Sequence, residues 1–168
     1  MSIFKKIALL LLFVPLMSAC EEQNFSGALV AYNHTIDKPV YKFTVNGAMG
    51  PNVDPESGGG KRSCCVSLPK KWHPGLHVKV VWVYDRLTDD SPQLPPQSAD
   101  VEIPMYDHAG NIHVHFYDKD IVRIVISNCG AEHPFYPMDP QLLLPWKANR
   151  TKDEYLKFEN PRGPGHAC

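Results

Sequence analysis

The sequence has no apolar run long enough to cross a membrane, no long helical periodicity and no excess of one charge. Its longest apolar run, residues 7–16, falls short of the roughly 20 residues that a bilayer span requires. Basic and acidic side chains nearly balance, with 17 Lys and Arg against 18 Asp and Glu. This balance argues against a nucleic-acid partner, which would need a concentrated basic face. The run at residues 7–16 is too short for a membrane span and must have a different role.

The N-terminal segment has the pattern of an export signal. Two lysines precede the apolar run, and the small residues Ser18 and Ala19 stand directly before Cys20. A basic start, a short apolar stretch and small residues before a cut are typical of a secretory signal peptide. Because a cysteine follows the cut, the pattern resembles a bacterial lipobox; ordinary secretion with Cys20 merely nearby is the alternative. We predict a signal peptide at residues 1–19 and a lipidated tether at residues 20–27.

The predicted anchor is lipid rather than a basic patch. Removal of the leader leaves 15 basic and 18 acidic side chains, so the net charge changes from −1 to −3. Two or more acyl chains hold a protein on a membrane essentially permanently. Glu21, instead of an aspartate, follows Cys20, which by analogy with lipoprotein sorting favours the outer membrane. We expect a protein on the periplasmic side of the envelope.

Disulfide bonds are the expected role of the remaining cysteines, which are Cys64, Cys65, Cys129 and Cys168. An even count in an exported domain favours disulfides over metal or redox chemistry. Cys64 and Cys65 are neighbours in a predicted strand, so their side chains should point to opposite faces. We therefore disfavour a bond between them and expect one to pair with Cys129 and the other with Cys168. A free thiol at Cys168 is the alternative.

Period-two alternation of apolar and polar residues predicts seven strands. They cover residues 28–32, 40–45, 64–68, 77–84, 101–106, 112–117 and 121–127. Pro104 favours an edge position for the fifth strand, and residues 118–120 are typical of a tight hairpin. Short strands separated by turns predict an all-β fold, a two-layer antiparallel β-sandwich with residues 28–168 as one domain.

Helical signals are confined to the C-terminal part. Thr151 and Glu154 have the spacing of a capping box, and Asp139-Pro140 is an N-cap followed by proline at the first helical position. Both patterns predict short helical turns. Residues 49–62 are typical of a flexible loop, and residues 91–99 of a stiff, proline-rich one.

Two of the eight histidines could begin a metal site. His113 and His115 lie two apart on a predicted strand, so both imidazoles project from one face. A zinc or copper ion would need a third ligand from His108, His133 or Asp118. The alternative is that both histidines belong to the polar outer face of a strand whose inner face is apolar. We favour this alternative and predict no metal and no other cofactor.

No sequence pattern predicts catalysis. A Gly-x-Ser-x-Gly nucleophile elbow is absent. Residues 58–62 superficially resemble a phosphate loop, but Pro55 stands where that loop has glycine and Arg62 where it has Ser or Thr. Catalytic residues can converge from any sequence order, yet we expect a binding protein rather than an enzyme.

Partner contacts are expected at two tryptophans and one acidic segment. Trp72 and Trp146 lie in loop-like contexts, where tryptophan can anchor a partner or stack on sugar. The alternative is that each plugs an end of the sandwich. Asp85, Asp89 and Asp90 could form a rim that recognises a basic surface, or could be a solvated loop.

Several motifs resemble one specific family. They are Val45-Asn-Gly47, Gly58-Gly-Gly60, Cys64-Cys-Val-Ser-Leu-Pro69, Trp72-His-Pro-Gly-Leu76, Val78-x-Val-x-Trp82 and Val114-His-Phe116. These runs resemble the Gram-negative envelope lipoproteins grouped as domain of unknown function 3304, over roughly residues 28–137. Members of that family occur beside type VI secretion phospholipase effectors, and some are interpreted as immunity proteins for them.

The resemblance implies an immunity protein that neutralises a phospholipase-type toxin by direct binding. The family has no catalytic residues to transfer to this chain. A structural or glycan-binding envelope lipoprotein is the alternative function. In either case we expect the membrane, through the N-terminal lipid, and another macromolecule as partners, and no nucleic acid.

Overall fold

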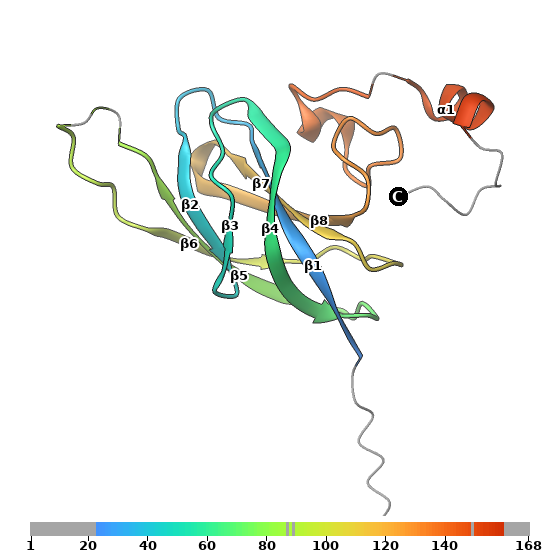
Figure 1. Ribbon diagram of the computed structural model, residues 1–168, viewed down its shortest axis with the longest axis horizontal. Coiled ribbons are helices and arrows are strands. Elements are labelled where there is room, and N and C mark those ends of the chain that lie inside the picture. Colours follow the sequence, from blue (N-terminus) through green and yellow to red (C-terminus); the bar gives the residue numbers. More distant parts are fainter. Residues whose placement is uncertain (1–22, 87, 89, 149, 160–168) are drawn as a thin grey trace, which may run out of the picture.

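The structure is a computed structural model in which two four-stranded sheets pack face to face (Figure 1). It describes residues 23–86, 88, 90–148 and 150–159. The first sheet has the order β4-β1-β7-β8, with β1 (Asn24–Asn33), β4 (Ser57–Pro69), β7 (Asn111–Tyr117) and β8 (Ile121–Ser127). The second has the order β3-β2-β5-β6, with β2 (Val40–Val45), β3 (Ala48–Gly50), β5 (His77–Tyr84) and β6 (Gln97–Glu102). The predicted all-β sandwich is confirmed.

Most strands lie where the alternation predicts them. β2, β5 and β8 have the predicted bounds, whereas β1 begins at Asn24 and so includes half of the predicted tether. The short strand β3 was not predicted. β6 ends at Glu102, before Pro104. β6 is an edge strand, as the proline indicated. One pairing differs from the expected antiparallel pattern, because β1 and β7 run parallel.

The main core lies between the sheets, because alternate residues of each strand face the opposite sheet. Phe43 and Trp82 of the second sheet meet Phe116 of the first, with ring centroids 5.2 Å and 6.0 Å apart. These three side chains are almost completely buried. Regular alternation would place Tyr41 on the same face as the buried Phe43, but Tyr41 is 54% exposed, because the register between β2 and β5 shifts at this residue.

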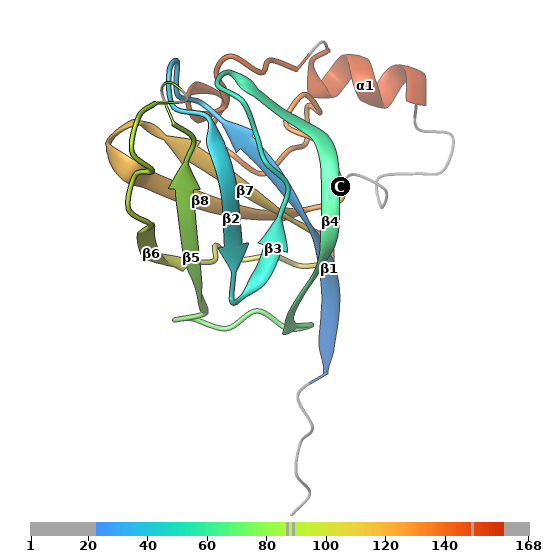
Figure 2. The same cartoon turned by 60° about the vertical axis from the view of Figure 1, so that its left-hand side comes forward.

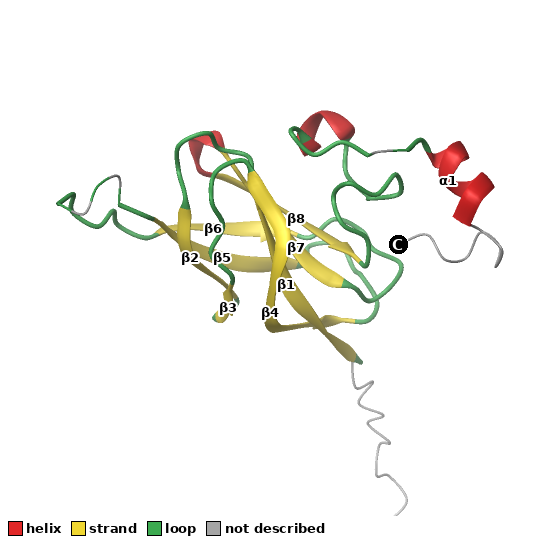
Figure 3. Ribbon diagram, turned by 45° about the horizontal axis from the view of Figure 1, so that its top comes forward, coloured by secondary structure: helices red, strands yellow, loops and turns green. Residues whose placement is uncertain are grey.

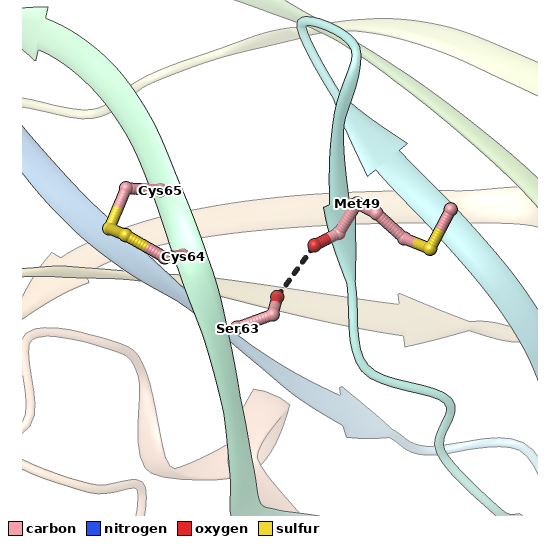
Figure 4. The surroundings of a disulfide bond; sticks show 4 residues. All are labelled: Met49, Ser63, Cys64 and Cys65. Carbon is pink, nitrogen blue, oxygen red and sulfur yellow. Dashed lines mark hydrogen bonds between the residues drawn. A yellow bond between two sulfur atoms is a disulfide. The ribbon is translucent and has the colours of Figure 1, made fainter.

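Cys64 and Cys65 form a disulfide with each other, so the predicted pairing of these residues with Cys129 and Cys168 is wrong (Figure 4). Cys129 is also disulfide-bonded. Cys20 and Cys168 lie outside the described residues.

A β-bulge explains the error. Along the pairing of β4 with β1, Val66 faces Gly27 and Ser63 faces Leu29, so the two cysteines together oppose the single residue Ala28. The prediction assumed regular alternation, which would send neighbouring side chains to opposite faces. A bulge breaks that alternation and lets two adjacent side chains meet on one side of the strand.

The glycine-rich segment belongs to β4 and is not the flexible loop that residues 49–62 were expected to form. A second register shift lies here, between Val30 and Tyr32 of β1. A Cβ on Gly58 would lie 2.6 Å from the backbone of Tyr32, and Gly59 has a φ of +75°. Glycine therefore allows β1 and β4 to approach closely at this second bulge.

The chain after β8 folds back over the outer face of the first sheet. It contains a 3₁₀ helix (Pro140–Leu143) and α1 (Lys152–Glu159), as Figure 3 shows in red. The predicted caps are confirmed: the Asp139 carboxylate accepts the Gln141 N–H at 2.8 Å, and the Glu154 N–H donates to the Thr151 hydroxyl at 3.2 Å. Among the described residues, no helix is long and apolar enough to cross a membrane.

The strand directions define two ends of the molecule (Figure 2). The near end is where β1 begins at Asn24, and it carries the β4–β5 connection, residues 70–76. The far end is where β1 finishes at Asn33, and it carries residues 34–39, the β5–β6 connection and the turn at residues 118–120. Ten residues of β1 separate the two ends by roughly 30 Å at about 3.3 Å per residue.

Candidate functional site

A pocket of about 410 Å³ lies at the far end. It is lined by Asp37, Lys38, Pro39, Tyr84, Asp85, Leu94, Pro95, Gln97 and Asp120. Three separate connections meet there: the one after β1, the one between β5 and β6, and the turn before β8. Three carboxylates against one ammonium make its rim acidic, while proline and leucine side chains supply apolar surface. The lining therefore suits a basic side chain with apolar neighbours.

Two buried polar residues fix the first of these connections. Asn33 donates through Nδ2 to the Lys38 carbonyl at 2.8 Å, and its Oδ1 accepts the Thr35 hydroxyl at 2.8 Å. Both Asn33 and Thr35 are fully buried. Side-chain bonds of this kind, from Asn or Thr to nearby backbone groups, fold the backbone into a turn. The pocket wall at Asp37 and Lys38 is therefore held in place from within.

Tyr84 joins the second and third connections. Its hydroxyl donates to Oδ1 of Asp120 at 3.0 Å, and Nζ of Lys38 lies 5.6 Å from its ring centroid. Burial raises the pKa of Tyr84 to about 12, and the Asp120 carboxylate adds to this shift. The hydroxyl therefore remains a donor at neutral pH and orients the carboxylate. The Asp85 N–H donates to the Pro39 carbonyl at 2.8 Å, which ties the end of β5 to the same wall.

The predicted acidic contacts divide between the pocket and the loop beside it. Asp85 lines the pocket and is exposed, and Asp90 is exposed on the β5–β6 connection without lining it. Asp89 lies outside the described residues. In the sequence, the density of charged residues was the only sign that the segment from Asp85 to Asp90 could contact a partner. The contribution of Asp37 and Asp120 was missed, because only the strand order brings these distant positions together.

Both predicted tryptophans pack inwards. Trp72 is half-buried against the main core at the near end, where its Nε1 donates to the Ile103 carbonyl at 2.8 Å. Trp146 is half-buried against the outer face of the first sheet, with its ring edge-on to Tyr32 and His34 at 5.2 Å and 4.7 Å. Trp72 thus plugs one end of the sandwich, whereas Trp146 covers a face.

His113 and His115 lie on the outer face of β7, as predicted, but that face is buried. The two side chains are 3% and 0% exposed, because the C-terminal segment covers them. Tyr32 of β1 stacks on both imidazoles, and Tyr136 of the covering segment packs edge-on or tilted against them. A second, smaller core therefore forms outside the sandwich.

A chain of hydrogen bonds runs through this second core. Nδ1 of His34 is 2.7 Å from the Leu144 carbonyl, which can only accept, so this nitrogen carries the proton. Nε2 of His34 is 2.9 Å from Nδ1 of His115, and Nε2 of His115 is 2.7 Å from the Tyr136 hydroxyl. With both imidazoles neutral, every bond has one donor and one acceptor. The chain fastens the covering segment at two points, Tyr136 and Leu144.

Burial keeps these imidazoles neutral. It lowers the pKa of His34, and it lowers the pKa of His115 well below its usual value with help from the neighbouring His34 and His113. Burial also lowers the pKa of His113 to about 4. Nε2 of His113 bonds the Ser127 carbonyl at 3.0 Å, and its Nδ1 has no hydrogen-bond partner within the described residues.

The described residues contain no candidate metal site. Among them, no group of three or more His, Cys, Asp or Glu side chains is placed to hold an ion. The partners of His115 are instead His34 and Tyr136, and sequence reasoning missed both. Neither residue has a pattern that would have indicated it, because their meeting depends on how the C-terminal segment crosses the sheet.

The two packed sheets define an all-β sandwich protein with a pocket at its far end. A family model described as a protein of unknown function (DUF3304) matches residues 32–124, more than half of the chain. The chain belongs to this family. No curated protein and no solved structure matches it.

Proposed function

We propose that this chain is a lipid-anchored envelope protein that binds a partner at its far end, and that the partner is a phospholipase-type toxin which it neutralises. The far-end pocket carries the proposal. Its acidic rim lies beside exposed apolar side chains, with Ile36 at 76% and Leu94 at 43% exposure. Acidic groups around apolar surface are a common composition for recognising a basic protein surface.

The place of the pocket fits an anchored protein. Three residues separate Cys20 from Asn24, so a lipid on Cys20 holds the near end within about 14 Å of the headgroups. β1 then carries the far end roughly 30 Å further out. A partner can reach the pocket without displacing the anchor, and confinement to the membrane surface raises the local concentration of the inhibitor.

Cysteine use supports the proposed compartment. The Cys64–Cys65 bond and the disulfide-bonded Cys129 belong in an oxidising environment such as the periplasm. The lipobox pattern before Cys20 supports the same location. Outer-membrane placement rests on Glu21 alone and is part of the proposal.

Inhibition requires no chemistry from this chain. The buried Asn33–Thr35 turn and the Tyr84–Asp120 bond hold the pocket walls in one arrangement, so little conformational freedom is lost on binding. A complex that covers the active-site mouth or the membrane-contact face of the lipase would suffice. The acidic rim would meet a basic surface there and speed the encounter.

The test is deletion of the gene in a strain that carries the secretion system. Self-poisoning by sister cells that disappears when the phospholipase effector gene is also deleted is the expected result. An envelope defect in the absence of any attacker would instead favour the structural or glycan-binding alternative. A deletion strain without either phenotype would refute the immunity role.

Complementation then locates the binding surface. Asp85→Lys reverses one charge on the pocket rim, and we expect it to restore protection poorly. Asp107→Lys makes the same change on an exposed residue between β6 and β7, at the near end, and should protect as well as the parent. Equal protection by both variants, at equal protein levels, would remove the pocket from the proposal.

A further inference from the structure

The β4–β5 connection is fastened to the residue from which the chain leads to the proposed anchor. The Lys70 N–H donates to the Gln23 carbonyl at 2.7 Å, and Nζ of Lys70 donates to Oε1 of Gln23 at 3.3 Å. Gln23 is the third residue after Cys20, so the two lie at most about 11 Å apart along an extended chain. Figure 2 shows the connection, residues 70–76, beside the start of β1. Lipid on Cys20 would therefore hold this connection next to the headgroups.

The β6–β7 connection holds the β4–β5 connection in one arrangement. Nε1 of Trp72 donates to the Ile103 carbonyl, and the Ile103 N–H donates to the Leu76 carbonyl, both at 2.8 Å. The Tyr106 hydroxyl donates to the Pro69 carbonyl at 2.5 Å, at the point where β4 ends. Two separate segments thus form one braced surface at the near end.

The side chains of this surface suit a membrane interface. Lys70, Lys71 and His73 are exposed. Trp72 stands among them in the sequence and is half-buried. Met105 on the β6–β7 connection is 69% exposed and adds an apolar side chain. Lysine lays its stem against apolar groups while its ammonium reaches the polar layer, and tryptophan is enriched at the level of the headgroups.

We propose that the β4–β5 connection rests on the phospholipid bilayer that holds the anchor, with the ammonium groups of Lys70 and Lys71 among the headgroup phosphates. The contact orients the domain, so that β1 rises from the membrane and the far-end pocket faces away from it. The inference rests on the lipid anchor of the proposed function and adds a second, noncovalent contact with the same membrane.

The length of the tether selects the bilayer as the occupant. Three residues separate Cys20 from Asn24, so the gap between the connection and the lipid is on the order of 10 Å. A folded domain of 100 residues has a radius of gyration of about 13 Å and would not fit into this gap. The membrane surface is therefore the partner that the connection meets first.

Net charge does not drive this contact. Glu21 and Glu22 lie in the tether, and Asp107 is exposed on the β6–β7 connection, so carboxylates offset the two lysines. The lysines act locally instead, because a basic side chain is attracted to an anionic membrane only within about one Debye length. The covalent lipid supplies affinity, whereas the connection selects one orientation among those that the tether allows.

Fluorescence quenching tests the contact. The lipidated full-length chain is reconstituted into vesicles of phosphatidylethanolamine and phosphatidylglycerol, with or without brominated acyl chains that quench nearby tryptophan. His73→Trp places a probe on the β4–β5 connection, and Asp90→Trp places a matched probe on the β5–β6 connection at the far end. The parent supplies the signal of the native tryptophans, which is subtracted. We expect several-fold stronger quenching of the first probe, because roughly 30 Å separate the two ends.

Charge reversal tests the part played by the lysines. Lys70→Glu combined with Lys71→Glu, in the His73→Trp chain, keeps the backbone bond to Gln23 and should lower the quenching by about half or more. Lys119→Glu makes the same change on an exposed residue at the far end and should leave the quenching unchanged. Exchange of phosphatidylglycerol for neutral phosphatidylcholine should act like the double reversal. Near-ultraviolet circular dichroism checks that each variant keeps its fold.

Several results would overturn the proposal. Equal quenching of the two probes would mean that the domain turns freely on its tether or lies on one side. Stronger quenching of the Asp90→Trp probe would mean that the far end meets the membrane. Undiminished quenching in the chain with both lysines reversed, or in vesicles without anionic lipid, would exclude the lysines from the contact.

These outcomes separate this inference from the proposed function. A chain that carries no lipid would refute the anchor itself, and mass spectrometry of the N-terminus detects this before reconstitution. A lipidated chain whose His73→Trp probe escapes quenching would refute only the membrane contact of the connection. A deletion strain that is never poisoned would refute the immunity role, whatever the quenching shows.

Discussion

The Tyr136 hydroxyl donates a hydrogen bond to Nε2 of His115 across 2.7 Å, between two side chains that are both buried. Tyr136 belongs to the segment that follows the last strand, and His115 to a central strand of the first sheet. This contact and the His34–Leu144 bond convert a loop that could lie in solvent into a cover for the sheet. Stability of the cover therefore depends on one phenol and two neutral imidazoles.

Replacement of Tyr136 by phenylalanine should destabilise the protein by about 1–3 kcal/mol, because Nε2 of His115 loses its donor inside the protein. Urea unfolding at pH 7 measures the change. Tyr41→Phe is the control, since the Tyr41 side chain is 54% exposed and should tolerate the same change within about 0.5 kcal/mol. Equal stability of the two variants would show that the bond contributes nothing.

Stability should fall as the pH is lowered from 7 to 4. Unfolded histidine has a pKa of about 6.5, whereas burial lowers the pKa of folded His113 to about 4. Above pH 6.5 both states are neutral and no penalty exists. Between these two values the unfolded state binds a proton and the folded state does not, so the free energy of unfolding decreases by up to about 3 kcal/mol from His113.

Urea unfolding at several pH values tests this linkage. Tyr32 and Tyr136 pack against His113, and positive charge on Arg62 further disfavours its protonation. His113→Gln removes the titrating group and should reduce the acid-induced loss, while His73→Gln, on an exposed residue, should keep it. An unchanged pH dependence in His113→Gln would contradict the assignment.

Mass spectrometry of a tryptic digest should find the cysteine bond inside one peptide. Cleavage after Arg62 and Lys70 releases residues 63–70, which contain both Cys64 and Cys65. Without reductant this peptide should be about 2 Da lighter than its dithiol form and resist alkylation, since the bond joins neighbours. A peptide cross-linked to the Cys129 fragment would restore the pairing predicted from the sequence.

Removal of the Cys64–Cys65 bond should have little effect on stability. The loop that it closes is the shortest possible, so the chain-entropy model gives a contribution of only about 1 kcal/mol. Thermal unfolding of the double variant Cys64→Ser and Cys65→Ser, compared with the parent, measures it. A loss several times larger would mean that the bond supports the bulge in the folded state.

Two neighbouring glycines should respond differently to alanine. A Cβ on Gly58 would meet the Ala31 carbonyl oxygen at 2.6 Å, whereas a Cβ on Gly60 meets nothing within 4 Å. We expect Gly58→Ala to cost about 1–3 kcal/mol through overpacking, and Gly60→Ala to change stability by less than about 1 kcal/mol. Chemical denaturation of both variants decides whether close approach is the reason for glycine at residue 58.

Replacement of Cys20 by serine tests the anchor. The variant should lose incorporated palmitate and leave the membrane fraction, because lipidation requires the thiol of this residue. The double variant at Cys64 and Cys65 should keep both properties. Palmitate retained by Cys20→Ser would contradict the lipobox interpretation.

The fold could be predicted from the sequence because regular alternation dominates most strands. In β5, for example, period-two alternation places Val78, Val80 and Trp82 on one face, and all three are buried. The errors fall where the period breaks. Register shifts at Tyr41 and at Cys64–Cys65 turn side chains that a regular strand would have sent elsewhere.

The candidate site was less accessible to sequence reasoning. Asp85 stood out by local charge density, but Asp37 and Asp120 come from connections that only the strand order brings together. The two histidines on the outer face of β7 could be predicted from the sequence, but the C-terminal segment that covers this face could not. Tyr136 lies in a segment without periodicity, and its contact with His115 depends on long-range packing that local patterns do not encode.

The position of β1 has a mechanical consequence. β1 is the strand that follows the predicted anchor, and it is hydrogen-bonded on both sides, to β4 and to β7. A pull between the membrane and a partner at the far end would load both ladders along their length, so that many bonds share the force at once. If the chain is anchored and binds its partner as proposed, this arrangement lets it hold that partner under tension without unravelling from its N-terminus.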